Sequence, residues 1–253
     1  NANIGASKTI KSNLKTTVSG LNEAKVKNAG TIEMSGTNES VGIYLKGSEG
    51  TNKATGTITA DEEKSIGIYG VKNGTKTSKL ENAGTIETKK KASVGMLGEE
   101  ESTINNLSGG IINTDEKESA GIYGSKGSTI TNAGTISAKK TGSAGIYADD
   151  SKVTNASRGI INTQEGKSAG VYAIFNKKVY DIDNSGTINV GSTTSPTTET
   201  KGVGIYAKLE NNATATGNVT IDNKNTVAIN IKDSIGIYAQ NDTGKDNRII
   251  VNN

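Results

Sequence analysis

Paired carboxylates are the side chains of this sequence best suited to chemistry. Cleavage of a glycosidic bond uses two Asp or Glu side chains held a short distance apart, and the nearest candidates are Asp149 with Asp150 and Asp181 with Asp183. Both pairs lie in segments with the composition of turns and do not stand out from the corresponding segments elsewhere in the chain. We expect no catalytic residues and no enzymatic activity; a carbohydrate-active lyase or hydrolase is the alternative.

Two absent residue types narrow the chemistry further. The 253 residues include no Cys and no His, which excludes a thiolate nucleophile, a zinc–thiolate site and a Ser-His-Asp triad. The sequence also lacks a phosphate-binding glycine loop, so we expect no metal and no cofactor. The formal net charge of +3 is too small, for this length, to indicate a nucleic-acid partner.

Residues 174–181 are the strongest candidates for contact with a partner. They include Phe175, Lys177, Lys178 and Tyr180, among them the only Phe of the chain and the only Tyr outside a repeated motif. An aromatic side chain beside two lysines suits an acidic or glycan partner. The alternative is that the aromatic side chain packs against its own part of the fold.

An internal repeat indicates the elements that position these residues. A Ser-x-Gly-Ile-Tyr block, with variants, occurs eight times. Its glycines are Gly42, Gly67, Gly95, Gly121, Gly145, Gly170, Gly204 and Gly236. A second block, Asn-Ala-Gly-Thr-Ile at residues 28–32, 82–86 and 132–136, precedes some copies, and weaker forms of it precede the others.

Each repeat contains three short apolar segments separated by Gly, Asn, Ser, Lys or Asp, which is typical of strands rather than helices. Three strands per repeat predict one coil of a right-handed parallel β-helix, so we expect an all-β solenoid of about eight coils. The low aromatic content of 4% agrees with this fold, because a narrow coil buries only one or two side chains per strand.

The repeat also sets the expected organisation of the chain. Residues 1–25 are expected to form a partial coil at the N-terminal edge, and residues 26–253 to form the β-helix. Segments that depart from the repeat should loop out of the coils. These insertions lie near residues 174–181, 191–201, 209–218 and 240–247.

A recurring asparagine follows the first apolar segment of most repeats. Stacked asparagines at a corner of the coil would hydrogen-bond along the helix axis and satisfy the turn backbone. We therefore assign them a structural role. They are Asn28, Asn82, Asn106, Asn132, Asn155, Asn184 and Asn223.

Charged pairs in one turn alternate in sign from coil to coil. The pairs are Asp61-Glu62, Lys89-Lys90, Asp115-Glu116, Lys139-Lys140 and Gln164-Glu165. Coils stacked in register would place each basic pair between acidic neighbours about 5 Å away. The pattern predicts a ladder of ion pairs rather than a polyanion-binding site.

The tyrosines of the first motif should form a stripe. If Val41 and Ile43 point into the coil, then Ser40, Gly42 and Tyr44 point outward, and the same holds in every copy. An exposed tyrosine stripe suits recognition, including stacking on sugar rings; the alternative is that the rings cover the glycines of the sheet. The candidate binding residues are Tyr147, Tyr172, Tyr206 and Tyr238.

The two blocks, Asn-Ala-Gly-Thr-Ile followed by Ser-x-Gly-Ile-Tyr, resemble the passenger regions of type V autotransporter adhesins over residues 26–253. They are most similar to the large fusobacterial outer-membrane autotransporters, the RadD-like group. The resemblance implies a β-helical stalk displayed on the bacterial cell surface, outside the outer membrane. The lack of Cys agrees with this resemblance, because passengers cross the outer membrane unfolded and disulfides would impede their passage.

The function expected from this resemblance is attachment to host cells or other bacteria, through the loops or the tyrosine stripe. The receptor would be a glycan or a protein, and a purely structural spacer is a further alternative. Any membrane contact would be made by a C-terminal barrel of the parent protein. Unpaired strand edges at the two ends favour end-to-end self-association.

Overall fold

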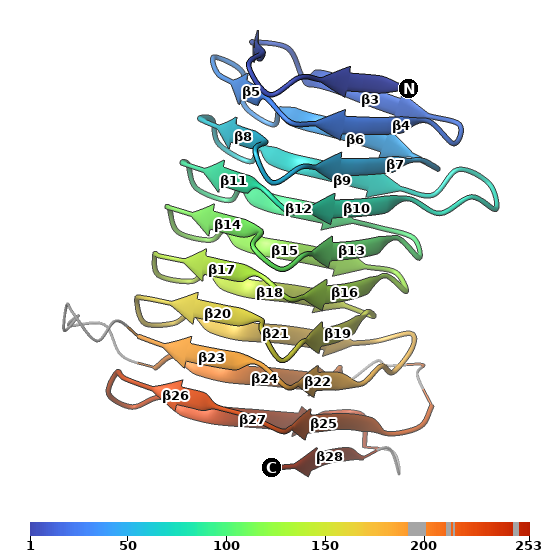
Figure 1. The fold of residues 1–253 in the computed structure, drawn as a ribbon. Helices are drawn as coiled ribbons and strands as arrows, with labels where there is room; N and C mark the ends of the chain where they lie inside the picture. Colours follow the sequence, from blue (N-terminus) through green and yellow to red (C-terminus); the bar gives the residue numbers. More distant parts are fainter. Residues whose placement is uncertain (192–200, 211–213, 215, 245–247) are drawn as a thin grey trace.

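The chain folds into a parallel β-helix. Its computed structural model describes residues 1–191, 201–210, 214, 216–244 and 248–253. Regular structure in these residues consists only of strands, and no helix there is long and apolar enough to cross a membrane. Consecutive strands in the chain belong to three different sheets, and each strand pairs in parallel with its equivalents one coil away (Figure 1).

Sheet A carries the first strand of each coil. Its register places Asn82 of one coil directly against Asn106 of the next. The strands in spatial order are β1 (Ala2–Ile4), β4 (Lys25–Asn28), β7 (Glu49–Asn52), β10 (Lys79–Asn82), β13 (Thr103–Asn106), β16 (Thr129–Asn132), β19 (Lys152–Asn155), β22 (Ile182–Asn184), β25 (Val219–Asn223) and β28 (Ile249–Asn252).

Sheet B carries the second strand of each coil, with one isoleucine facing inward from nearly every strand. Its strands are β2 (Thr9–Ser12), β5 (Thr31–Met34), β8 (Thr57–Ala60), β11 (Thr85–Thr88), β14 (Ile111–Thr114), β17 (Thr135–Ala138), β20 (Ile160–Thr163), β23 (Thr187–Val190) and β26 (Val227–Ile229).

Sheet C carries the third strand, which contains the Gly-Ile-Tyr motif. Its strands are β3 (Thr16–Leu21), β6 (Val41–Lys46), β9 (Ile66–Val71), β12 (Val94–Gly98), β15 (Ala120–Ser125), β18 (Ala144–Asp149), β21 (Ala169–Phe175), β24 (Val203–Leu209) and β27 (Ile235–Asn241).

The predicted all-β fold is confirmed, but the solenoid has about nine coils instead of eight. The difference lies at the N-terminus, where β1, β2 and β3 contribute one strand to each sheet. Residues 1–25 thus hold a three-stranded coil rather than the expected partial one. The motif search missed this coil because Ser19 takes the position of the tyrosine and pairs with Tyr44.

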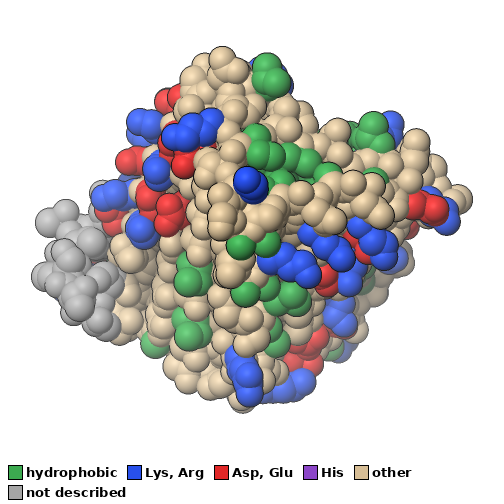
Figure 2. Space-filling model, turned by 45° about the horizontal axis from the view of Figure 1, so that its top comes forward, with side chains coloured by type: hydrophobic (Ala, Val, Ile, Leu, Met, Phe, Trp, Pro, Cys, Tyr) green, Lys and Arg blue, Asp and Glu red, His purple; other side chains and the backbone are tan. Residues whose placement is uncertain are grey.

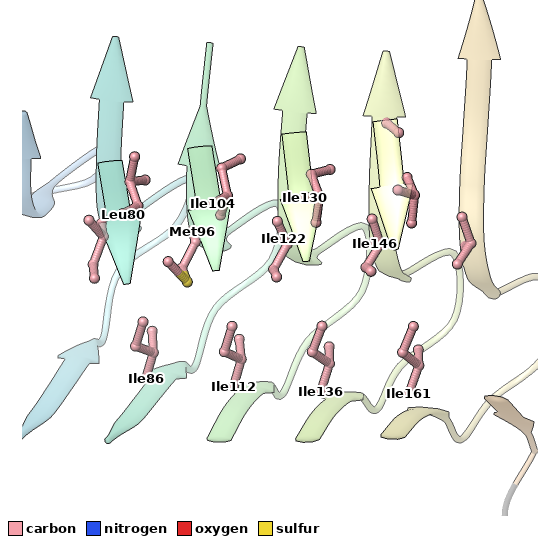
Figure 3. Packing of buried hydrophobic residues seen from close by; sticks show 14 of the residues in the cluster. Leu80, Ile86, Met96, Ile104, Ile112, Ile122, Ile130, Ile136, Ile146 and Ile161 are labelled. Atoms are coloured by element: carbon pink, nitrogen blue, oxygen red, sulfur yellow. The ribbon is translucent and has the colours of Figure 1, made fainter. Parts of the chain in front are cut away.

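The core is a narrow column of aliphatic side chains. Sheet A contributes residues such as Ile104 and Ile130, sheet B Ile112 and Ile136, and sheet C Ile122 (Figure 3). All of these are completely buried. Each coil packs on the coils above and below, so cohesion is local and roughly additive along the axis, as in other solenoids.

The strict alternation predicted for the Gly-Ile-Tyr motif is wrong at its glycine. Gly42 and Ile43 are both buried, whereas Val41 is half-exposed and Ser40 is buried rather than outward. A Cβ atom on Gly42 would lie 2.7 Å from the carbonyl oxygen of Gly67. The strand therefore turns two successive positions inward at the glycine, and the residue before it faces outward.

The asparagines occupy the corner between sheets A and B, where they form a continuous hydrogen-bonded ladder. Each side-chain Nδ2 donates to the Oδ1 of the asparagine one coil further on, at 2.5–2.9 Å. All but the last two members are buried. The ladder runs through Asn28, Asn52, Asn82, Asn106, Asn132, Asn155, Asn184, Asn223 and Asn253.

The predicted charge ladder is confirmed on the turns between sheets B and C. Lys89 lies 3.0 Å from Asp61, Lys139 lies 2.7 Å from Asp115, and Lys140 lies 2.8 Å from Glu165. Figure 2 shows basic and acidic side chains in adjacent positions on the surface. These pairs are solvent-exposed, so each contributes at most about 1 kcal/mol to stability.

Candidate functional site

The outer face of sheet C carries the tyrosine column. Strand register aligns Tyr123, Tyr147, Tyr172, Tyr206 and Tyr238 in consecutive coils. Leu97 interrupts the column between Tyr69 and Tyr123. The rings lie on the outer surface but are only half-exposed, apart from Tyr238 in the last coil, which is 38% exposed.

The tyrosine rings cover one another. The rings of Tyr172 and Tyr206 are stacked with centroids 4.6 Å apart and an interplanar angle of 3°, and Tyr147 and Tyr238 continue the stack at 5.2 and 5.3 Å. Offset stacking of this kind stabilises by about 0.5–1.5 kcal/mol per pair. Because the ring faces of Tyr172 and Tyr206 contact neighbouring rings, the expected stacking of these faces on sugars is not available.

Burial in the column changes the acidity of the phenols. Loss of solvent raises the pKa of Tyr147 to about 12, and the neighbouring Tyr123 and Tyr172 add to the effect. Burial also raises the pKa of Tyr206. These groups are neutral hydrogen-bonding hydroxyls across the physiological pH range.

A cleft of about 580 Å³ opens beside the end of β18. It lies where the segment after β21 meets the turns that follow the sheet C strands of the three preceding coils. This cleft, here called the lysine cleft, brings together side chains that are far apart in the sequence. It is lined by Glu101, Lys126, Gly127, Asp149, Asp150, Asn176, Lys177, Lys178 and Tyr180.

Asp150 organises the lysine cleft. Its carboxylate accepts backbone N–H hydrogen bonds from Asn176 at 2.7 Å, from Lys177 at 3.0 Å to each oxygen, and from Lys178 at 3.3 Å. The residue is 8% exposed and has a left-handed backbone with φ of 47°. A buried carboxylate with several backbone donors fixes a loop strongly, so the lysine-bearing segment is held in one geometry.

The predicted loop residues divide into two groups. Lys177 and Lys178 are exposed, Tyr180 is half-exposed, and the Lys178 ammonium lies 5.1 Å from the centroid of the Tyr180 ring. The hydroxyl of Tyr180 lies over Gly127, 3.1 Å from where a Cβ atom would be. These three side chains form the wall of the lysine cleft.

Phe175 is not available for binding, which corrects its assignment as a candidate contact residue. Its side chain is completely buried and its neighbour across the sheet is Leu209. Strand β21 continues for three residues beyond the tyrosine motif, so inward positions fall at Val171, Ala173 and Phe175. The ring therefore packs in the core, as the alternative interpretation of this segment held.

The acidic candidates are separated by the fold. Asp149 and Asp150 both reach the lysine cleft, together with Glu101. Burial and the adjacent Asp150 raise the pKa of Asp149, while Lys177 and Lys126 oppose the shift. Asp181 instead accepts a hydrogen bond from the backbone N–H of Thr220 at 3.2 Å, and Asp183 lies 3.9 Å from Lys152 on sheet A.

The remaining predicted sites have structural positions or lie partly outside the described residues. The seven predicted asparagines belong to the corner ladder, away from the outer face of sheet C. Residues 192–200, 211–213, 215 and 245–247, within three of the expected insertions, lie outside the described residues. In the part of the chain that is described, no cluster of three acidic side chains has the arrangement of a metal site.

Sequence reasoning missed the cleft because its parts come from four consecutive coils. The signal that was present is the Asp149-Asp150 pair. Register aligns Asp149 with Ser125, so Asp150 takes the turn position that Lys126 has in the preceding coil. Sequence reasoning also missed two ladders of buried serines at the other corners, in which a backbone N–H such as that of Ser65 donates to the hydroxyl of Ser93 at 3.2 Å.

A known protein family has a sequence model that matches most of this chain. Residues 2–178 match the model of the family described as BigA third pectate lyase-like domain. The match begins at β1 and ends within the segment that Asp150 holds, so it includes Lys177 and Lys178. Comparison with curated proteins gave no match.

Proposed function

Because the chain belongs to the family of BigA third pectate lyase-like domains, we propose that it is a β-helical segment of a bacterial surface protein that attaches the cell to host cells or other bacteria. The finer assignment, a passenger of a type V autotransporter similar to the large fusobacterial group, is part of this proposal. The repeated motifs support it, and display outside the outer membrane follows from it.

The lysine cleft is the observation that carries the binding part of the proposal. Most coils present a regular surface of paired charges, but here one segment leaves the coil and is fixed by the Asp150 carboxylate. Loops on a rigid solenoid are the usual location of recognition. A segment that is already ordered loses little entropy when a partner binds.

The charges of the cleft indicate the polarity of the receptor. Glu101 is paired with Lys72, and the Asp150 carboxylate is occupied by backbone donors. The ammonium groups of Lys177 and Lys178 have no ion-pair partner within 4.0 Å among the described residues. These two ammonium groups outnumber the one accessible carboxylate of the cleft, that of Asp149, so the net accessible charge is positive. A positive cleft suits a receptor with anionic groups, either an acidic glycan or an acidic protein surface.

Binding of the purified chain to host cells and to bacteria tests this proposal. We expect saturable binding that is reduced at least about tenfold in the double variant Lys177→Ala, Lys178→Ala, and that weakens as salt is added. The matched control is Lys27→Ala, Lys53→Ala, which removes two exposed lysines from distant coils. Equal loss in both variants, or no binding by the original chain, contradicts the proposal.

A carbohydrate-active enzyme is the second candidate, because three carboxylates line the lysine cleft. Two of them are engaged, as described above, which leaves Asp149 as the one accessible acid. We propose that the chain is not an enzyme. Incubation with polygalacturonate tests this. If the chain cleaves the polymer faster than buffer alone does, and Asp149→Asn abolishes that cleavage, the chain is an enzyme instead.

Self-association through the end coils is a separate part of the proposal. Leu21 in the first coil is 50% exposed and Val251 in the last strand is 42% exposed. Apolar side chains beside unpaired strand edges favour contact between copies. We expect the mass measured by light scattering to rise with concentration; a constant monomer mass contradicts it.

A further inference from the structure

A second surface on sheet C has the features of a binding groove. The outward residue before each motif glycine is large in most coils: Val41, Ile66, Val94, Val203 and Ile235. In three consecutive coils it is an alanine that is only 7–9% exposed, and register places Ala120, Ala144 and Ala169 directly beside one another. A depression follows these three alanines and reaches Val94 of the preceding coil; it is here called the alanine trough.

The alanine trough is bounded on one side by the tyrosine column. Two overlapping depressions, of about 340 and 240 Å³, share Gly142, Ala144 and Tyr147. Tyr123 and Tyr172 complete the wall, and Glu118 and Lys167 stand on the opposite rim. The floor is uncharged, and the rim carries one group of each sign.

Within the described part of the chain, the tyrosine hydroxyls along this wall have no hydrogen-bond partner. In coils with a large outward residue, Tyr69 donates to Glu99 at 2.7 Å and Tyr206 donates to Gln240 at 3.3 Å. The hydroxyls of Tyr44 and Tyr238, which also belong to such coils, make no hydrogen bond to a described residue. Among the described residues, the hydroxyls of Tyr123, Tyr147 and Tyr172 make no such hydrogen bond. The trough thus presents three neutral hydroxyls in a row, each able to donate and to accept.

We propose that the alanine trough binds an uncharged saccharide chain lying along the β-helix axis across three coils. The apolar faces of the sugar rings would pack on the alanine floor, and their hydroxyls would bond to Tyr123, Tyr147 and Tyr172. The site is distinct from the lysine cleft, and it deepens the proposed function by naming the class of a second ligand.

The spacing of the wall argues against an extended peptide. The rings of Tyr123, Tyr147 and Tyr172 follow one another at 4.8 and 5.2 Å. A strand repeats on one face about every 6.6 Å, so its side chains would fall about 3 Å out of step over three coils. Sugar rings in an extended glycan are similar in length to the coil spacing, and their hydroxyls match neutral phenols without a charged partner.

The test measures binding of cello-, xylo- and manno-oligosaccharides to the complete chain. The first variant, Ala120→Val, Ala144→Val, Ala169→Val, fills the trough with the residue that this column already carries at Val41 and Val94. The second, Tyr123→Phe, Tyr147→Phe, Tyr172→Phe, removes the hydroxyls and keeps the rings. The control is Lys177→Ala, Lys178→Ala. Circular dichroism and thermal unfolding verify that each variant is folded.

We expect at least one neutral series to bind, with affinity reduced about tenfold or more by either trough variant, the loss expected when several hydrogen bonds of ordinary strength are removed. The control should bind it unchanged. Absence of binding by every neutral series overturns the inference, as does binding that both trough variants retain. The inference is also overturned if an extended peptide binds the original chain and the Ala→Val triple variant no longer binds that peptide. Loss in the control alone places the saccharide in the lysine cleft.

Discussion

Both carboxylate oxygens of Asp150 accept the backbone N–H of Lys177 at 3.0 Å. This contact joins the turn after β18 to the segment after β21, and it holds Lys177 and Lys178 at the rim of the cleft. It depends on a short, buried acid at a turn where the backbone is left-handed. The geometry of the cleft is thus set by one side chain that itself has little contact with solvent.

Replacing Asp150 should release the segment that it holds. In Asp150→Ala the amides of residues 176–178 lose their acceptor, so we expect them to exchange with solvent at least tenfold faster and the unfolding free energy to fall by about 1–3 kcal/mol. Asp150→Asn retains one acceptor oxygen, and asparagine tolerates the left-handed backbone at this position. Its effect should therefore be smaller. Hydrogen exchange measured by mass spectrometry compares the two; equal protection in Asp150→Ala and the original chain would show that the carboxylate does not hold the loop.

The asparagine ladder should show the cost of an interrupted buried network. Asn106 donates to Asn132 and accepts from Asn82, both at 2.9 Å. Asn106→Ala removes the donor to the Oδ1 of Asn132 and one of the two acceptors of the Asn82 amide, whose other acceptor is the carbonyl oxygen of Ile111. We expect a loss of about 2–4 kcal/mol in denaturant unfolding. The same change at Asn223, which is half-buried near the end of the ladder, should have a smaller effect. If Asn106→Ala and Asn223→Ala lower the unfolding free energy equally, burial does not determine how much each asparagine contributes to stability.

A charged variant of the ladder should depend on pH. Asn106→Asp places a carboxyl in a buried site facing the Oδ1 of Asn132, where only its protonated form can donate. Its folded pKa is therefore raised above the usual value of about 3.9. Stability that is present below that value should be lost as the pH rises through the raised pKa. Unfolding curves at acidic and neutral pH measure this, and a variant that is more stable at neutral pH than in acid would refute the account.

The tyrosine column predicts a loss of stability in alkaline solution. Tyr147 has a folded pKa of about 12, against about 10 in the unfolded chain. Its contribution is complete below the unfolded value and is lost as the pH rises from about 10 to 12, because only the unfolded chain ionises there. Absorbance titration should show a component near 12 that disappears in Tyr147→Phe. Titration of all tyrosines near 10 in the folded chain would contradict the burial of the column.

The gap in the column offers a stabilising substitution. Leu97 lies in register between Tyr69 and Tyr123, so Leu97→Tyr should extend the ring contacts and raise the unfolding free energy by about 0.5–1.5 kcal/mol. Leu97→Ala is the matched control and should lower it. If Leu97→Tyr is no more stable than the original chain, the rings do not stabilise one another across coils.

The features that the sequence predicted correctly are those that repeat in every coil. Period, strand punctuation and the position of Asn82 or Asn132 follow directly from stacking, so the sheets, the ladder and the ion pairs could be deduced from spacing. Asn52 was missed because its motif has Gly50 in place of a large residue. Leu45 fills that space, since a Cβ atom on Gly50 would lie 2.6 Å from it. When a large side chain on one strand fills the space left by a glycine on another strand, the sequence around the glycine does not reveal it.

The features that could not be predicted depend on departures from strict repetition. Alternation fails at Gly42 because the backbone of the next coil approaches it closely. As a result Val41, which was expected to face inward, faces outward, and Ser40, which was expected to face outward, is buried. Phe175 was assigned to a surface because the extension of β21 by three residues beyond Tyr172 is not visible in the sequence. The lysine cleft combines parts of four coils, and loop lengths alone do not indicate which turn a loop will contact.

The most direct test of the central claim is lysine acetylation of the chain while it is bound to target cells, followed by mass spectrometry. If the lysine cleft is the contact surface, Lys177 and Lys178 should be protected at least about fivefold relative to the unbound chain, whereas Lys27 and Lys53, exposed on distant coils, should be modified equally in both. Equal modification of Lys177 and Lys178 in the bound and unbound chain would contradict the account.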